Sequence, residues 1–395
     1  MPLSDTRIAE LTTIRQSLHQ LPELSGQERR TAESIRECLQ RFQPSRVITQ
    51  IGGHGVAAIF DSGVVGSSVL VRCELDGLPI EETGNAAYCS RAAGHGHQCG
   101  HDGHMATVLG VAALITENPP PAGRVVLLFQ PAEETGQGAR AVIADPAFAD
   151  IRSQHVLGLH NLPGHAAHHI LLKHGPVNCA SRGMRIRLTG KAAHASMPET
   201  GVSPAAAVAS IIATLDSVPS LPDVDEDFAL VTVVHARLGE QAFGVAPAQG
   251  EVWATLRTLT DDRMAQLVAF AETTARETAL ERGLDLEISY ADVFHACTND
   301  AALTEHFRAS AAAHGFAVED LRDPLRFSED FGEYGRTGAS AMFFLGAGTD
   351  VPALHNPDYD FPDALINTGA TMFYTTILRL LGQSSRSSIA GSGID

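Results

Sequence analysis

A ten-residue segment, HGHQCGHDGH at 95–104, contains four histidines and one cysteine directly before a predicted helix. Cys99 and His101 are two positions apart at this junction, so both side chains can point into a cleft at the end of a strand. A thiolate and an imidazole together suit zinc, manganese, cobalt or nickel. For His95 and His97 we favour the ordinary alternative, solvated imidazoles in a glycine-rich loop.

Three further segments place metal-ligand residue types after apolar strands. Glu133 and Glu134 follow the apolar run RVVLLF, His160 ends another apolar strand, and His355 follows a third. Open α/β sheets bind ligands at the carboxyl ends of their strands, although an ordinary acidic helix start would also contain the two glutamates. A single histidine at a strand end is usually structural. Together, however, the four features supply a thiolate, carboxylates and imidazoles for two metal ions with a shared ligand.

The framework that must position these residues is an alternation of helices and strands. Helices are predicted near 5–20, 27–39, 102–116 and 135–144, and strands at 55–60, 68–75, 124–130 and 155–160. Ser4 is a plausible N-cap of the first helix. Strands interleaved with helices predict an α/β domain with a mixed, mostly parallel and buried sheet.

The pattern changes from Ser181 onward. Strands are predicted at 181–189, 228–236, 249–258 and 285–291, with helices at 203–217 and 261–281. The order β-α-β-β-α-β is that of a ferredoxin-like α+β unit. The α/β alternation then resumes with a helix at 299–314, a strand at 340–346 and a helix at 363–382.

The candidate ligands lie on both sides of the ferredoxin-like unit, which indicates an insertion. We therefore predict a discontinuous catalytic domain, 1–176 plus 294–382, interrupted by a lid at 177–293. The small, polar residues 383–395 are expected to form a flexible tail.

Composition limits the class of partner and the setting. The 395 residues include 28 Lys+Arg and 46 Asp+Glu, a formal charge of −18, which argues against binding to nucleic acid or to an anionic membrane surface. No window approaches the roughly 18 apolar residues of a membrane span. The six cysteines are scattered without a CxxC pair, and the first residues lack the apolar stretch of an export signal. These features predict a cytoplasmic protein.

Seven motifs resemble those of the hippurate hydrolase and aminoacylase family of dinuclear metalloamidases (peptidase family M20), which includes auxin-amino-acid conjugate hydrolases. They are RCELDGLPIEE (72–82), CGHDGH (99–104), QPAEETGQGA (130–139), GLHNLPG (158–164), GKAAHASMPETGVSPA (190–205), SED (328–330) and LHNPDYDF (354–361). They occur in family order across nearly the whole chain. The resemblance implies a metal-binding catalytic domain with an inserted ferredoxin-like domain that commonly dimerises.

The resemblance also implies a role for individual residues. Cys99 would bridge two divalent ions, manganese, zinc, nickel or cobalt. The other ligands would be His101, Glu134, His160 and His355. Glu133 falls at the position of the general base, and Asp76 at that of a residue that supports the ligands from behind. His194 matches a histidine that reaches the substrate carbonyl oxygen, in family dimers often from the neighbouring subunit.

Two positions depart from the family pattern. Glu74 stands where the family usually has Asp, which lengthens the side chain behind the metals by one methylene. Gly244 replaces an Asn that is associated with the polar end of the substrate. Arg257 still matches the pattern and could bind a carboxylate through two hydrogen bonds; the alternative is an exposed arginine at a strand end.

We therefore expect a metal-dependent amidohydrolase that cleaves an N-acyl amino acid or a related small amide, through a metal-activated water with Glu133 as general base. The departure at Gly244 leaves a dipeptidase, or a hydrolase of an unusual aryl amide, as an alternative. A homologue that binds metal or ligand without catalysis is a further alternative. The expected partners are the small-molecule amide and further copies of the chain, in a homodimer or higher homo-oligomer formed through the lid.

Overall fold

The computed structural model describes residues 2–219 and 223–382, and the predicted tail at 383–395 lies outside these residues. The chain divides into two compact units. Unit 1 comprises the described residues within Met1–Gly175, Thr298–Arg322 and Asp330–Asp395. Unit 2 comprises those within Pro176–Cys297 and Asp323–Glu329.

The segment 323–329 differs from the domain prediction, which placed all of 294–382 in the catalytic domain. It belongs to unit 2 because its backbone bonds to distant residues of that unit. Asn178 forms an isolated parallel bridge with Leu325, and Arg257 Nη1 donates to the Arg326 carbonyl oxygen at 2.5 Å. Such pairings join residues far apart in the chain, so no local pattern indicates them.

Unit 1 is built around an eight-stranded sheet with the strand order β1-β2-β4-β3-β5-β16-β6-β15. Its strands are β1 Arg46–Ile51, β2 Gly55–Asp61, β3 Ser68–Glu74, β4 Arg124–Gln130, β5 His155–Pro163, β6 Ile170–Leu172, β15 Val318–Asp320 and β16 Ala339–Gly348. The central strands β4, β3, β5 and β16 are mutually parallel, whereas the pairs β1–β2, β2–β4 and β16–β6 are antiparallel. The predicted mixed, mostly parallel sheet is confirmed.

Unit 1 contains several helices, of which α1 and α8 begin after a residue whose side chain caps them. The helices are α1 Asp5–His19, α2 Arg29–Gln40, α3 His101–Glu117, α4 Gly138–Ala144, α5 Phe148–Ile151, α8 Ala301–His314 and α9 Leu365–Gly382, with a 3₁₀ helix η2 at Asp330–Arg336. The Ser4 side chain accepts from the Arg7 N–H at 3.3 Å, as predicted, and Asp300 accepts from the Leu303 N–H at 2.9 Å. Within the described part of the chain, no helix combines the length and apolar character of a membrane span.

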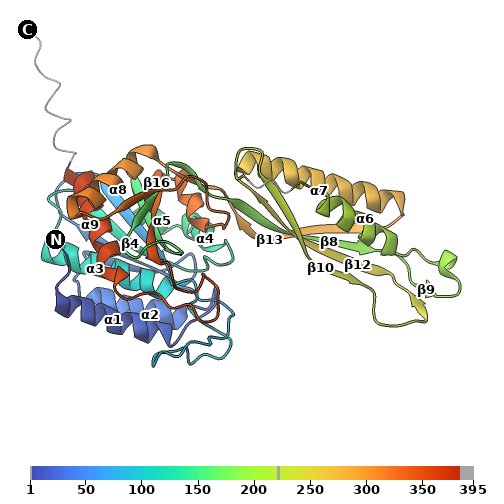
Figure 1. The fold of residues 1–395 in the computed structure, drawn as a ribbon, viewed down its shortest axis with the longest axis horizontal. Helices are drawn as coiled ribbons and strands as arrows, with labels where there is room; N and C mark the ends of the chain where they lie inside the picture. The colour runs from blue at the N-terminus through green and yellow to red at the C-terminus, as the bar shows by residue number, and fades with distance from the viewer. Residues whose placement is uncertain (1, 220–222, 383–395) are drawn as a thin grey trace, which may run out of the picture. The chain divides into compact units, whose positions relative to one another are not determined.

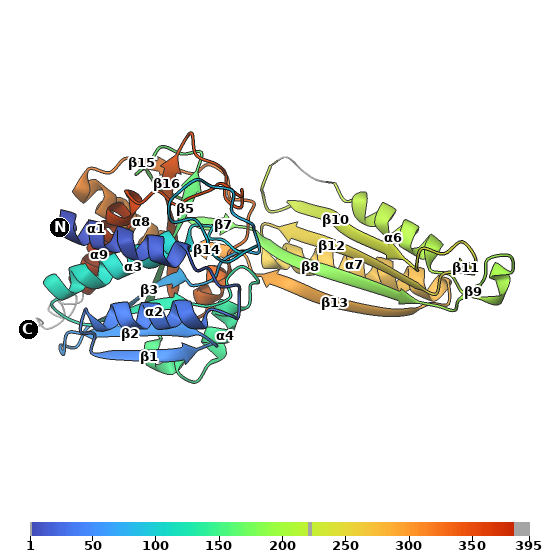
Figure 2. The ribbon, with the colours of Figure 1, turned by 90° about the horizontal axis from the view of Figure 1, so that it is seen from below.

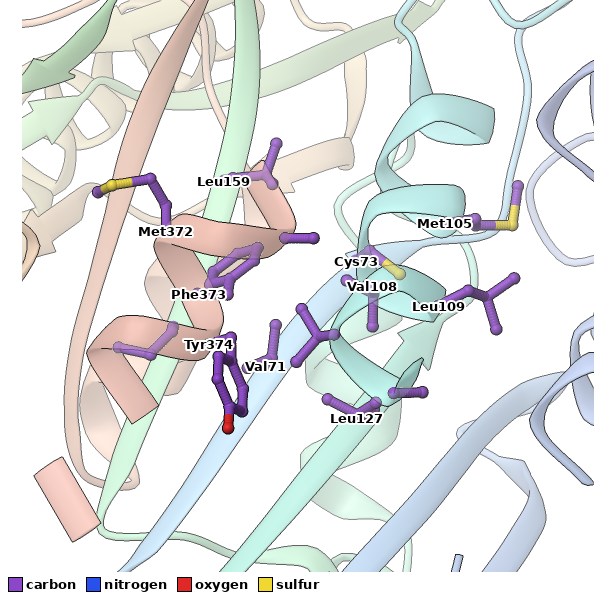
Figure 3. Close-up of a cluster of buried hydrophobic side chains, with 14 of the residues drawn as sticks. Val71, Cys73, Met105, Val108, Leu109, Leu127, Leu159, Met372, Phe373 and Tyr374 are labelled. Carbon is purple, nitrogen blue, oxygen red and sulfur yellow. The ribbon is translucent and has the colours of Figure 1, made fainter. Parts of the chain in front are cut away.

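The core of unit 1 lies where α3 and α9 pack on the sheet. α3 contacts α1, α2 and α9 (Figure 1), and it also contacts β3 and β4. Figure 3 shows the side chains that fill this layer, among them Val71 and Leu127 from strands, Val108 from α3 and Phe373 from α9. All four are fully buried. The first residue of α3 is His101, so this core fixes a predicted metal ligand.

Unit 2 contains a four-stranded antiparallel sheet with the order β10-β12-β8-β13 (Figure 2). Its elements are β8 Ala180–Thr189, β9 Ala193–His194, η1 Pro198–Thr200, α6 Ala205–Asp216, β10 Ala229–Leu238, β11 Val245–Ala246, β12 Gln249–Thr258, α7 Asp261–Glu281 and β13 Asp285–Phe294. Both helices pack on the sheet and on each other. In chain order this is the predicted β-α-β-β-α-β pattern.

Two of the places where the chain passes between the units lie in short strands. β7 (Gly175–Asn178) and β14 (Cys297–Asn299) pair with each other.

Buried residues alternate along β12, where Val252, Ala254 and Leu256 face the helices of unit 2 and the residues between them are half-buried. Each unit therefore has its own sheet and its own hydrophobic core.

Candidate metal centre

The junction before α3 brings Cys99 and His101 to the same place. Gly100 has φ of +90°, and a Cβ at this position would lie 2.7 Å from the Asn161 side-chain oxygen, so both conformation and space require glycine. Cys99 and His101 are buried. The Cys99 sulfur lies 3.4 Å from Nε2 of His160. The tight turn therefore directs a thiolate and an imidazole into one buried region.

A second turn, after β4, carries the adjacent carboxylates. Ala132 has φ of +51°, and the Gly136 N–H donates to the Glu133 carbonyl oxygen at 2.7 Å. The Glu133 and Glu134 side chains each place an oxygen 3.8 Å from Nε2 of His101. Both carboxylates thus face the imidazole that α3 presents.

The two remaining histidines come from neighbouring parallel strands. His160 lies within β5, and its Nδ1 is 2.8 Å from the Asn161 carbonyl oxygen. His355 follows β16 in a segment without regular structure, with φ of +66° and its N–H donating to the Gln98 carbonyl oxygen at 2.9 Å. Nε2 of His355 lies 3.8 Å from Glu134 Oε2.

These side chains form overlapping groups whose potential ligand atoms lie within 4.8 Å of one another. Among them are Cys99–His101–His160, Cys99–Glu134–His355 and His101–Glu133–Glu134. Cys99 belongs to the first two groups. The structure therefore brings together every residue for which the sequence predicted direct metal binding, with Glu133 beside them.

The donor atoms fit a divalent cation. Nδ1 of His101 is 2.8 Å from the Asp76 carbonyl oxygen, so Nε2 is directed at the cluster, where it is buried and has no hydrogen-bond partner among the described residues. Burial lowers the pKa of His101, but Asp76, Glu74 and Glu134 together raise it to about 10. This excess of negative charge favours a cation, and a metal ion would replace the proton.

The net pKa shift at His160 is opposite to that at His101, because burial dominates at His160. Burial lowers the pKa of this imidazole to about 3. The ring is therefore neutral near pH 7, and Nδ1 is positioned to donate to the Asn161 carbonyl oxygen, which leaves the Nε2 lone pair toward Cys99. A neutral imidazole oriented in this way is the form that binds metals.

Asp76 supports the cluster from beneath, as the resemblance implies. Its Oδ2 accepts from the Ser25 hydroxyl at 2.7 Å and from the Glu134 N–H at 3.0 Å, and its Oδ1 lies 3.5 Å from Nδ1 of His101. Burial raises the pKa of Asp76, but these hydrogen bonds and His101 lower it below its usual value. The carboxylate therefore stays ionised and links the turn at Glu134 to the start of α3.

Glu74, the residue that replaces the usual Asp, is fully buried behind the cluster. Its carboxylate lies 2.6 Å from Nδ1 of His104 and also pairs with Arg72. Burial opposes ionisation, but Arg72 and His104 hold the pKa of Glu74 well below its usual range. Glu74, His101 and His104 also form a compact group. Both nitrogens of His104 are engaged by protein groups. Glu74 and His104 therefore support the candidate metal centre from behind through hydrogen bonds.

Hydrogen bonds from His104 extend to the two segments that carry His160 and His355. Nε2 of His104 lies 2.5 Å from the Asn161 side-chain oxygen, and the Asn161 amide donates to the Tyr359 hydroxyl at 2.6 Å. Burial raises the pKa of Tyr359 well above its usual value, and the nearby Cys99 raises it further, so the phenol keeps its proton. No role was predicted for His104, Asn161 or Tyr359. The only signal was their presence within the family motifs.

The prediction that His97 is solvated is wrong. Its side chain is buried, and its ring centre lies 6.3 Å from that of His19 in α1. Burial lowers the pKa of His97 to about 4. His19 in turn binds Asp102 at 2.8 Å, and Arg15 also pairs with Asp102. The first helix of the chain therefore covers this loop, which a local reading of the glycine-rich motif does not indicate.

Unit 2 holds the other three candidate residues. His194 in β9 pairs with Val245 in β11. Its side chain is exposed, with Nδ1 2.7 Å from the Ser196 hydroxyl. The Gly244 carbonyl oxygen accepts from the Ala195 N–H at 3.1 Å. Apart from its chain neighbours, no atom of the described residues lies within 4 Å of the position of a Cβ at Gly244.

Arg257 in β12 is partly buried, unlike the exposed alternative considered from the sequence. Besides the Arg326 carbonyl, its Nη1 donates to the Ser328 hydroxyl at 2.8 Å. Burial lowers the pKa of Arg257. No carboxylate of the described residues pairs with it.

The chain belongs to peptidase family M20/M25/M40, because the model of this family matches residues 70–379. It is a metal-dependent hydrolase. The resemblance inferred from the seven motifs is therefore confirmed.

Named relatives match nearly the whole chain. It is 31% identical over 386 residues to the N-acetyl-L-cysteine deacetylase of Bacillus subtilis (strain 168), with 96% of this chain and 90% of the relative covered. It is 29% identical over 375 residues to the hippurate hydrolase of Campylobacter jejuni, with 94% and 97% covered. A solved Bacillus subtilis structure, described as a dinuclear metal-binding peptidase of the M20 family, matches with a TM-score of 0.80 at 25% identity and covers 96% of this chain and 99% of that chain.

The turn at Gly100 generates a test of the metal centre. In Gly100→Ala the new Cβ collides with Asn161, so we expect displacement of Cys99 and His101 and a metal content well below two ions per chain, measured by mass spectrometry after reconstitution with Zn²⁺. Gly26→Ala is the matched control, because Gly26 has φ of +78° and no atom within 4 Å of its Cβ position. It carries the same backbone strain, about 1–2 kcal/mol, and should keep its metal. Full metal content in Gly100→Ala would contradict the assignment.

Proposed function

We propose that this hydrolase cleaves the amide bond of N-acyl amino acids with the help of two divalent cations. The observation that carries the proposal is the convergence of Cys99, His101, Glu134, His160 and His355, with Cys99 common to two groups. The names of the relatives agree with this substrate class, because N-acetyl-L-cysteine and hippurate are both N-acyl amino acids. Each has an amide bond beside a free carboxylate.

Those five residues would hold the two ions, and Cys99 would be shared between them. Sulfur, imidazole and carboxylate donors suit zinc, manganese, cobalt or nickel. When bound, two such ions polarise an amide carbonyl and lower the pKa of a water molecule toward neutrality. Asp76 holds the Glu134 backbone and the His101 ring in place, which maintains the spacing of the ligands.

Glu133 is proposed as the general base. Its side chain is buried beside His101 and Glu134, and the neighbouring Glu134 supplies a carboxylate for the metals. Glu133 can therefore take a proton from the attacking water and deliver it to the leaving amine nitrogen. Such a transfer typically contributes about 10²- to 10⁴-fold to the rate.

Residues of unit 2 are proposed to recognise the substrate. Nδ1 of His194 is engaged by Ser196, and Nε2 is proposed to donate to the substrate carbonyl oxygen and to stabilise negative charge there. Arg257 has a carbonyl and a hydroxyl as neutral partners. Its guanidinium is proposed to bind the substrate carboxylate.

The open space at Gly244 favours a second candidate, a dipeptidase or a hydrolase of aryl amides. Because a Cβ there would meet no atom in the described part of the chain beyond its neighbours, this position leaves room that a larger side chain would fill. A group bulkier than the usual polar end of the substrate could therefore lie beside it.

Two further parts of the proposal concern assembly and location. We propose a homodimer or higher homo-oligomer through unit 2, supported by exposed apolar side chains there: Phe243 is fully exposed, and Val234 and Val245 are more than half exposed. We propose a reducing, cytoplasmic setting, supported by six cysteines that are scattered along the chain without a CxxC pair.

The two adjacent carboxylates provide a test of their separate roles. Glu133→Gln should retain two ions per chain and lose about 10²- to 10⁴-fold in kcat, because only proton transfer is removed. Glu134→Gln should instead bind less metal, because a ligand is weakened. Metal content and steady-state rates of both purified variants separate these outcomes. Full activity in Glu133→Gln would overturn the assignment of the base.

Recognition of the carboxylate by Arg257 is tested with paired substrates. Arg257→Met should lower kcat/KM about 10- to 100-fold for an N-acetyl amino acid, since a hydrogen-bonded charge pair is lost. It should change the value much less for the corresponding carboxamide. Arg187→Met, which removes an exposed pairing with Glu287 in the same unit, is the control. Equal losses on both substrates would argue against a carboxylate contact.

The substrate class is tested with a panel of hippurate, N-acetyl amino acids, dipeptides and aryl amides, each assayed after reconstitution with Mn²⁺, Zn²⁺, Co²⁺ or Ni²⁺. We expect turnover of the N-acyl amino acids. Activity confined to dipeptides or aryl amides would favour the second candidate. A protein that binds two ions and cleaves no amide in the panel would refute the proposed activity.

A further inference from the structure

His355 differs from the other four proposed ligands in how it is held. Cys99, His101 and His160 are buried, and Glu134 is nearly so, whereas about half of the His355 side chain is exposed. His355 also lies outside any helix or strand. Helix and strand geometry therefore do not set its position, and specific contacts of the surrounding segment must do so.

The backbone at His355 shows that its surroundings constrain it. Its φ of +66° lies in the left-handed region, which a non-glycine residue adopts when neighbouring contacts impose it. One such contact is the bond from the His355 N–H to the Gln98 carbonyl oxygen. A second is the turn in which the Tyr359 N–H donates to the Asn356 carbonyl oxygen at 3.0 Å. This turn makes the short path from His355 to Tyr359 compact.

Tyr359 is the buried end of that path. Its side chain is fully buried, and its hydroxyl accepts from the Asn161 amide at 2.6 Å. Asn161 directly follows His160, and its other side-chain atom contacts His104 on α3. A single amide thus joins the segment of His355 to the strand of His160 and to the helix that begins with His101.

We propose that Tyr359 is a positioning residue for the metal centre, and that its hydrogen bond with Asn161 sets the distance of His355 from Cys99 and Glu134. The inference rests on the proposed metal site. Groups that orient a ligand in this way typically change metal affinity about 10- to 100-fold when they are removed.

Other contacts keep this segment docked when the hydroxyl is removed. The Phe361 ring packs against Gly103, where even a Cβ would collide with it. Asp360 pairs with Arg15 at 2.6 Å and accepts from the Tyr88 hydroxyl at 2.6 Å. Tyr359→Phe therefore changes the orientation of His355 and leaves the segment in place.

The test measures metal binding without substrate. Metal-free wild type and Tyr359→Phe are titrated with Zn²⁺ against a chromophoric chelator, and the affinities of the two ions are fitted. We expect about a tenfold loss of affinity for one ion in Tyr359→Phe and an unchanged affinity for the other. His355→Ala should weaken the same ion more strongly. Asn161→Leu, which removes the other partner of the hydrogen bond, should show at least the loss seen in Tyr359→Phe.

Tyr374→Phe is the matched control. The Tyr374 hydroxyl donates to the Asn118 carbonyl oxygen at 2.6 Å and is likewise on a buried tyrosine (Figure 3). Asn118 follows the far end of α3, about 25 Å along the helix from His101. Both variants lose one hydroxyl and should show a similar fall in melting temperature, but Tyr374→Phe should bind both ions like wild type.

The outcomes separate the two proposals. Suppose that wild type binds two ions, that His355→Ala weakens the binding of one of them, and that Tyr359→Phe weakens neither. This result would overturn the role of Tyr359 and leave the metal centre intact. Equal loss of affinity in Tyr359→Phe and Tyr374→Phe would show a general effect of stability and would also overturn it. A wild-type protein that binds no Zn²⁺, or a His355→Ala protein with unchanged binding, would refute the metal centre itself.

Discussion

The structure of unit 1 depends on the pairing of buried charge directly behind the candidate metal centre. Arg72, Glu74 and Asp330 are almost completely inaccessible to water, and an isolated buried charge costs several kcal/mol. Arg72 pairs with both carboxylates and also donates to Gln130 at 2.9 Å. These bonds leave the neighbouring strands β3 and β4 and the helix η2 little freedom to shift. The turns that follow β3 and β4 carry Asp76 and Glu134, so the same pairing also determines where those residues lie.

The parallel sheet also brings candidate ligands that are distant in the chain together at one edge. The strands β4, β3, β5 and β16 are neighbours in that order, and each contains or is followed by a residue of the cluster. Carboxylates come from the turn after β4, and His160 and His355 come from β5 and from the segment after β16. Backbone hydrogen bonds of the strands fix most of these positions. Where the strand ends early, before His355, hydrogen bonds that the Gln98 carbonyl oxygen and the Tyr359 hydroxyl accept are proposed to replace that constraint.

The two units divide the chemistry between them. Unit 1 holds every residue for which direct contact with metal ions is proposed, on a framework with a deeply buried core. Unit 2 has a separate core and carries His194 and Arg257, the residues proposed to contact the substrate. Under the proposed function, reaction type would depend on the parallel sheet and its turns, whereas substrate choice would depend on side chains such as Arg257 and on the missing side chain at Gly244. This division agrees with relatives of similar length that act on different N-acyl amino acids.

The sequence by itself determined the fold class, the β-α-β-β-α-β order of unit 2 and the identity of the candidate ligands. Helical periodicity and apolar runs are local, and rare residue types at strand ends are visible without a structure; α7 spans the predicted residues 261–281. The polar edge strand β1 has no such pattern and was not predicted. Only the tertiary structure decided that His97 is buried, that Arg72 pairs with Asp330, and that Asn161 bonds to Tyr359. The physical reason is that these interactions join residues up to 258 positions apart, and their cost or benefit exists only once folding removes both partners from water.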